Sequence, residues 1–148
     1  MKWKKRMMIL AASLFFTVIF CVWYVNDYYH SDESVQKYLQ ETASDSVSII
    51  EIPDGLFLDG PGEDTAMIFY PGAKVEYTAY VPLFGQLSEQ GIDCFLIKMP
   101  CNLAFLGKNK AEKIIDSYEY DNWYLSGHSL GGAMAASFAS GHLESLSG

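Results

Sequence analysis

Cysteine is scarce in this sequence, and so is positive charge beyond the first residues. Three cysteines among 148 residues are too few for a disulfide framework, and no zinc-type Cys/His spacing occurs. All 18 acidic residues follow position 26, against six lysines there, so residues 27–148 carry 6 − 18 = −12. A domain this acidic repels phosphates, so nucleic acid is not an expected partner.

The sequence also lacks internal repeats and low-complexity tracts, and its length fits one globular domain. Cys94 lies in a strand-like apolar run and is expected to be a small core residue. The alternative is a Cys94–Cys101 disulfide, which a location outside the cytoplasm would permit. Cys21 lies in the N-terminal apolar segment.

One long hydrophobic run stands at the N-terminus. Residues 7–25 carry no charge and would form a helix about 28 Å long, close to the thickness of a bilayer's hydrocarbon core. The basic residues within 1–6 favour the cytoplasmic side, and the aromatic residues after the run suit the far interface. We expect a single-pass cell-membrane anchor with the rest of the chain outside. The alternative is secretion after cleavage of a signal peptide, although the bulky exit CVWYV has no small-residue cleavage site.

Residues 26–46 are polar and acidic and are expected to form a spacer, with a short helix over 34–41. The β-type runs 47–52 and 55–60 then flank the turn residues PDG, which predicts a β-hairpin.

After the hairpin, apolar strand-like runs alternate with helical patterns. The expected strands are 66–70, 92–100 and 123–127, and the expected helices are 77–91, 107–118 and 130–140. Continuous apolar strands that alternate with helices predict an α/β domain over 47–148, with a mostly parallel sheet covered by helices on both faces.

Residues 127–131, GHSLG, match the G-x-S-x-G pattern, with a strand running into it and a small-residue helix leaving it. At such a strand–turn–helix elbow, Ser129 takes a strained backbone conformation and presents its hydroxyl as a nucleophile. Gly127 and Gly131 let strand and helix approach closely. The helix N-terminus places the N–H of Leu130 beside Ser129 as an oxyanion-hole donor. His128, adjacent in sequence, is expected to point away and not to act as the base.

The second oxyanion donor is expected from the loop after the 66–70 strand, YPGAK. The N–H of Ala73 is the candidate, with Lys74 as second choice. The alternative interpretation is an ordinary Pro-Gly turn.

The PGAKV loop, the stretch MPCNLAF and GHSLGG occur in this order within residues 47–142. In this respect the sequence resembles the alpha/beta-hydrolase superfamily, specifically the dienelactone-hydrolase-like alpha/beta hydrolase fold-5 group of bacterial membrane-anchored or secreted proteins. The resemblance implies Ser129 as nucleophile and Ala73 and Leu130 as oxyanion positions. It also implies a small-molecule acyl-ester substrate and no metal or organic cofactor.

A base for the serine is the missing part. In this fold the order along the chain is Ser, acid, His, whereas His142 and Glu144 follow Ser129 in the reverse order. His142 would also lie roughly 20 Å along the helix from the serine, and His30 lies in the spacer. We therefore expect the N-terminal portion of a membrane-anchored serine hydrolase, truncated before its acid and base and inactive or nearly so. The alternative is a non-catalytic fragment or a membrane-tethered interaction module.

The truncated sheet has a second expected consequence. The strand 123–127 would be an open edge, since no further strand is expected to follow it.

Overall fold

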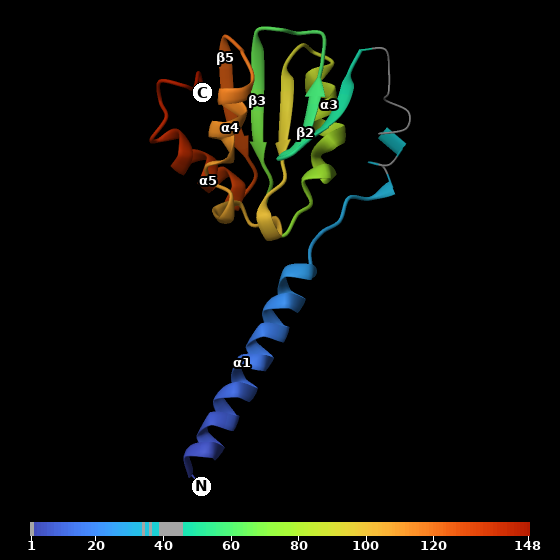
Figure 1. Ribbon diagram of the computed structural model, residues 1–148. Coiled ribbons are helices and arrows are strands. Elements are labelled where there is room, and N and C mark those ends of the chain that lie inside the picture. The colour runs from blue at the N-terminus through green and yellow to red at the C-terminus, as the bar shows by residue number, and fades with distance from the viewer. Residues whose placement is uncertain (1, 34, 36, 39–45) are drawn as a thin grey trace.

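The computed structural model describes the chain except residues 1, 34, 36 and 39–45 (Figure 1). The strands are β1 (Ser48–Ile52), β2 (Gly55–Asp59), β3 (Thr65–Tyr70), β4 (Asp93–Ile97) and β5 (Asn122–Gly127). The helices are α1 (Lys2–Asn26), α3 (Val81–Ser88), α4 (Lys110–Ser117) and α5 (Leu130–Ala139), and the short 3-10 helices are η1 (Tyr77–Tyr80), η2 (Pro100–Asn102) and η3 (Ala104–Leu106).

The five strands form one mixed sheet in the order β1-β2-β4-β3-β5. The pairs β3–β4 and β3–β5 are parallel, as expected from the strand–helix alternation. The expected hairpin β1–β2 is present, and β2 joins the parallel part by antiparallel pairing with β4. The α/β class is therefore confirmed, but half of the strand pairings are antiparallel, because the hairpin is part of the same sheet and does not merely precede it.

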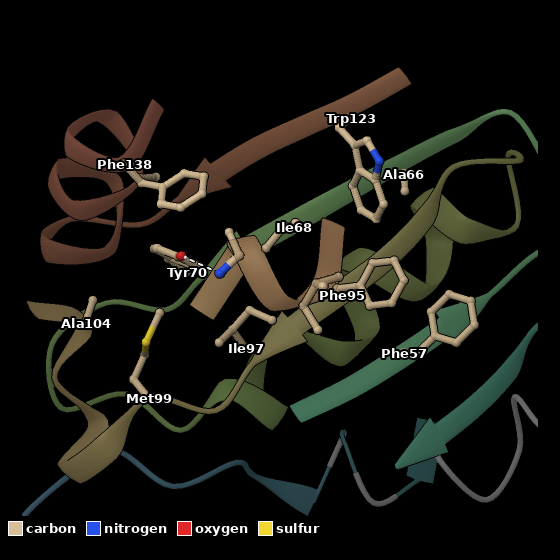
Figure 2. Close-up of a cluster of buried hydrophobic side chains, with 13 residues drawn as sticks. Phe57, Ala66, Ile68, Tyr70, Phe95, Ile97, Met99, Ala104, Trp123 and Phe138 are labelled. Carbon is tan, nitrogen blue, oxygen red and sulfur yellow. Dashed lines mark hydrogen bonds between the residues drawn. The ribbon is translucent and has the colours of Figure 1, made fainter. Parts of the chain in front are cut away.

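Helices cover both faces of the sheet, as predicted. Along β3, side chains alternate between the faces, so Ile68 packs on the side of α4 and α5 while Phe69 packs on the side of α3. Figure 2 shows the first of these clusters, in which Phe95 and Phe138 are almost completely buried. Each fully buried side chain of this size contributes about 1.5–3 kcal/mol relative to an exposed one.

Tyr70, at the end of β3, connects the sheet to α4. Its hydroxyl donates to the carbonyl of Lys108 (2.6 Å) and accepts from the N–H of Ala111 (3.0 Å; Figure 2). Burial raises the pKa of Tyr70 to about 12. The end of β3, from which the loop with Ala73 departs, is thus held by the helix that covers it.

Several element boundaries differ from the expected ones, mainly because of proline. The helix expected over 77–91 opens as η1, and α3 begins at Val81 because Pro82, which lacks an N–H, belongs in a first turn. The strand expected over 92–100 ends at Ile97, and Pro100 begins η2. The helix expected over 34–41 falls mostly outside the described residues.

Most of helix α1 extends away from the domain (Figure 1). Within the described part of the chain, Trp3–Asn26 is the one helix long and apolar enough to cross a membrane, and its apolar portion is entirely exposed. A signal sequence near an N-terminus satisfies the same criteria of length and apolar composition.

The polar segment after α1 is not separate from the domain. The backbone of Tyr29 pairs with Val75 in the loop after β3, and Val35 is 2% exposed within the cluster under α3. Residues of the expected spacer thus contribute to the fold.

The open edge expected at β5 is partly covered. The N–H of Ser147 donates to the carbonyl of Trp123 (2.7 Å), and the N–H of Leu125 donates to the carbonyl of Gly148 (2.9 Å).

All three cysteines are free, so the structure has no Cys94–Cys101 disulfide. Cys94 is fully buried, as expected of a core residue, and burial raises the pKa of its thiol to about 12. Cys101 is exposed.

Candidate active site

Ser129 occupies the junction between β5 and α5. Its backbone has φ 51° and ψ −118°, a left-handed conformation outside the helix that costs a non-glycine residue about 1–3 kcal/mol. The residue is exposed, and its hydroxyl makes no capping hydrogen bond to α5. A strained, exposed serine at a strand–helix junction is the geometry that a nucleophilic serine would need.

Two glycines make this junction sterically allowed. A Cβ on Gly127 would lie 2.5 Å from the carbonyl carbon of Gly131, and a Cβ on Gly131 would lie 2.1 Å from the carbonyl oxygen of Tyr70. Backbone hydrogen bonds close the turn, from His128 to Tyr70 (3.0 Å) and from Gly131 to His128 (2.8 Å). A larger side chain at Gly127 would push β5 away from α5, and one at Gly131 would push α5 away from the end of β3.

Leu130 is the first residue of α5, where backbone N–H groups have no partner within the helix. The N–H groups of Gly131 and Ala133 are paired across the junction, with the carbonyls of His128 (2.8 Å) and Ser129 (3.1 Å). Among the described residues, no backbone or side-chain acceptor faces the N–H of Leu130. This donor, at the positive end of the helix dipole, is free to bind an oxyanion beside Ser129.

The loop after β3 packs directly against this turn. Pro71 and Gly72 are buried, and a Cβ on Gly131 would lie 2.4 Å from the carbonyl oxygen of Pro71. Ala73 follows and is exposed, and within the described chain its N–H has no acceptor. The N–H of Lys74 donates to the carbonyl of Asn102 (2.8 Å). Of the two candidates for the second oxyanion donor, Ala73 is therefore the one with an available N–H.

Tyr80 joins the loop to the elbow, a contact that the sequence did not predict. Its hydroxyl accepts from the N–H of Gly72 (3.2 Å) and lies 2.9 Å from Nδ1 of His128. The hydroxyl proton can then be donated to Nδ1, which places the proton of a neutral imidazole on Nε2. The ring of Tyr80 packs on Phe69, 4.5 Å between centroids. In the sequence Tyr80 is one of two tyrosines in the stretch YTAY, and nothing there distinguishes it for this role.

The three histidines have partners away from the serine hydroxyl. His142 lies beyond the far end of α5, stacked on Phe138 at 3.9 Å, with Nδ1 2.9 Å from that residue's carbonyl oxygen. His30 lies 3.7 Å from a carboxylate oxygen of Glu76. His128 contacts Tyr80, so none of the three is placed as a base for Ser129.

A metal centre is also not formed by the described residues, which contain no group of three or more His, Cys, Asp or Glu side chains suited to hold an ion. The arrangement provides an exposed serine and two unpaired backbone donors.

Comparison with models of protein families gives one match. Residues 66–148, more than half of the chain, match the model described as the alpha/beta hydrolase family. The matched range includes the loop with Ala73 and the elbow at Ser129. Comparison with curated proteins gives no match.

Proposed function

Because the chain belongs to the alpha/beta hydrolase family, we propose that it carries the nucleophile and oxyanion hole of a serine hydrolase that cleaves acyl esters. The observation that supports this proposal most is the elbow, where Ser129 precedes α5 with a positive φ of 51° and is followed by Leu130, whose N–H is unpaired among the described residues. Strained backbone of this kind persists only where the surrounding packing enforces it. Here the backbone packs so closely around Gly127 and Gly131 that neither position has room for a Cβ.

In this proposal the hydroxyl oxygen of Ser129 attacks the ester carbonyl carbon, and the carbonyl oxygen becomes an anion. The N–H groups of Ala73 and Leu130 bind that anion, and one such donor is worth about 10²–10³ in kcat. The intermediate expels the alcohol and leaves an acyl-serine, which water hydrolyses to the free acid. The covalent intermediate thus divides one difficult step into two easier ones.

The serine proton needs an acceptor, and none of the three histidines contacts it. We propose that a histidine and its orienting acid come from outside residues 1–148. Without them, only the oxyanion hole and substrate binding remain, and residues 1–148 alone should be nearly inactive. The same lack of a base is the observation that favours the second candidate, a membrane-tethered interaction module without catalysis.

We further propose that α1 anchors the protein in the cell membrane, with residues 1–6 in the cytoplasm and the hydrolase domain outside. The exposed apolar surface of α1 supports a membrane span. The basic residues at its start support the cytoplasmic position of the N-terminus. Alkaline extraction of membranes followed by N-terminal sequencing tests it. An intact N-terminus in the membrane pellet supports the anchor, and a mature chain that begins after α1 contradicts it.

A fluorophosphonate probe tests the nucleophile in membranes from cells that make the full-length protein. We expect peptide mapping to place the probe on Ser129 and Ser129→Ala to abolish labelling. Ser140→Ala is the matched control, because Ser140 is an exposed serine just beyond the same helix, and labelling should persist. Labelling that survives Ser129→Ala, or its absence from every variant, would reject the hydrolase proposal.

A further inference from the structure

The elbow lies at the edge of the domain from which α1 departs. Because β3, β4 and β5 are parallel, their carboxyl ends share one edge of the sheet. We call the loops at this edge, 71–76, 98–106 and 127–131, the elbow edge. Figure 1 shows the arrow of β3 pointing toward the side of the domain where α1 joins.

Direct contacts join the end of α1 and the residues after it to this edge. The ammonium of Lys74 lies 2.9 Å from a carboxylate oxygen of Asp27 and 4.3 Å from the centre of the Tyr24 ring. The N–H of Tyr29 donates to the carbonyl of Lys74 (2.7 Å), and the N–H of Glu76 donates to the carbonyl of Tyr29 (2.9 Å). The residue before Lys74 is Ala73, so the chain leaving α1 is bonded to the segment that carries the oxyanion donor.

The short connection limits how far this segment can be from a bilayer. From Val25, the end of the uncharged run, to Tyr29 the chain advances four residues, which span at most about 14 Å when fully extended. The headgroup region of one leaflet is itself roughly 5–7 Å thick. If α1 spans the membrane, the loop with Ala73 lies within about one headgroup layer and a few water layers of the hydrocarbon core.

The two ends of the sheet differ in the charged side chains that they carry. Lysines that follow β3 or β4, or lie in the first part of α4, are at or beside the elbow edge: Lys74, Lys98, Lys108, Lys110 and Lys113. Two of them are paired there with acidic side chains, Lys74 with Asp27 (2.9 Å) and Lys110 with Asp54 (2.7 Å), and Glu76 lies at the same edge. The turns and strand ends at the opposite edge carry acidic residues: Asp59, Glu63, Asp64, Glu89, Asp93, Glu119 and Asp121. Lipid phosphates therefore repel the opposite edge more strongly than the elbow edge, where acidic and basic side chains balance.

Two large apolar side chains are exposed beside the elbow edge lysines. Phe105 and Leu106 on η3 are 54% and 50% exposed. Together with Lys108 and Lys113 they line a hollow of about 420 Å³. Apolar side chains next to lysines suit the boundary between acyl chains and phosphates.

We propose that the elbow edge rests on the surface of the bilayer and that the substrate is an acyl ester of a lipid in that leaflet. The inference rests on the proposed serine hydrolase and on α1 as a membrane span. Ser129 forms a bond to the acyl carbon of the lipid, the ester C–O bond breaks, and the released lipid alcohol takes up the proton. Water then cleaves the acyl-serine to the fatty acid, so the net change is hydrolysis of one ester bond.

The placement can be measured without catalysis. Cys101 is exposed on η2 at the elbow edge, whereas buried Cys94 should not react, so a fluorescent dye can be attached to Cys101 in Cys21→Ser protein. The full-length protein is reconstituted in vesicles of phosphatidylcholine and phosphatidylglycerol that contain headgroup-nitroxide lipid. The control carries the dye at Glu63→Cys, with Cys101→Ser, on the exposed opposite edge. We expect at least threefold stronger quenching at position 101, and equal or weaker quenching there overturns the placement.

The substrate is tested by moving the domain away from the membrane. A Gly/Ser linker of about ten residues between Asn26 and Asp27 adds roughly 17 Å on average and leaves the contacts of Tyr29 in place. We expect hydrolysis of phosphatidylcholine in vesicles to fall at least tenfold, while hydrolysis of a short soluble p-nitrophenyl ester stays unchanged. An intact protein that cleaves only the soluble ester, or a linker without effect on lipid hydrolysis, overturns this inference alone. Cleavage of neither ester, with Ser129 unlabelled, overturns the proposed function as well.

Discussion

Gly131 is the residue at which the elbow has the least spare room. An added methyl group would lie 2.1 Å from the carbonyl oxygen of Tyr70 and 2.4 Å from that of Pro71, both backbone atoms that cannot rotate away. We predict that Gly131→Ala lowers the free energy of unfolding by about 1–3 kcal/mol or more, as overpacking does. Equilibrium urea unfolding measures this.

Gly141→Ala is the matched control for that prediction. Gly141 lies beyond the other end of α5, and there a methyl group meets only the carbonyl oxygen of Phe138 at 3.7 Å. A loss as large in Gly141→Ala as in Gly131→Ala would show that close packing at the elbow is not the cause.

The hydroxyl of Tyr80 connects the loop after β3 to the elbow through Gly72 and His128. Tyr80→Phe keeps the ring contact with Phe69 but leaves the N–H of Gly72 and Nδ1 of His128 without this partner. We predict that the free energy of unfolding falls by about 0.5–1.5 kcal/mol. We also predict slower labelling of Ser129 by the fluorophosphonate probe, because the loop with Ala73 is released from the elbow. Unchanged labelling kinetics in Tyr80→Phe would contradict a positioning role.

Prediction of single residues from sequence depends on how far local chemistry restricts their geometry. A serine between glycines at a strand–helix junction has few conformations open to it, and Ser129 lies at that junction with φ 51°. The choice between Ala73 and Lys74 depended on Asn102, whose carbonyl accepts from Lys74. That partner lies in a different loop, so the local sequence carries no signal for it.

At the scale of elements, the segment after α1 supports the loop that follows β3. Tyr29→Pro removes the N–H that donates to the carbonyl of Lys74, and the loss of one hydrogen bond is worth about 1 kcal/mol. We predict roughly fivefold faster hydrogen exchange at the amide of Glu76, which donates to Tyr29. In Tyr29→Phe the backbone donor stays and exchange should not change. Equal exchange in both variants and the wild type would show that the pairing does not hold the loop.

The sequence predicted the elements better than their contacts. Strands β3, β4 and β5 and helices α4 and α5 follow from hydrophobic periodicity, which reports which faces are buried. The pairing of Tyr29 with Val75 uses backbone groups that every residue type except proline possesses, so a polar spacer composition concealed it. Likewise, periodicity does not specify that β2 pairs with β4, since partner choice depends on contacts distant in sequence.

For the whole molecule, the buried side chains of Cys94 and Tyr70 should lower the free energy of unfolding as the pH rises above 9. Burial raises the pKa of Cys94 from 9.0 to about 12 and that of Tyr70 from 10.0 to about 12. Both groups therefore ionise in the unfolded chain before they ionise in the folded one. Stability is fully present below pH 9 and is lost as pH rises toward 12, by up to about 1.4 kcal/mol per group and pH unit.

Urea unfolding of the detergent-solubilised protein between pH 8 and 12 measures that loss. We predict that Cys94→Ala reduces the slope of stability against pH above pH 9, because one of the groups with a raised pKa is gone. The same slope in wild type and Cys94→Ala would show that the thiol is not the responsible group.

The central claim is that Ser129 faces an oxyanion hole built from two loops of one sheet edge. The most direct test is a crystal structure of the full-length protein after reaction with a phosphonate. We predict a covalent bond from phosphorus to the hydroxyl oxygen of Ser129, with the phosphonyl oxygen about 2.7–3.1 Å from the amide nitrogens of Ala73 and Leu130. A phosphonate bound to another residue, or bound to Ser129 with its oxygen away from both amides, would contradict the claim.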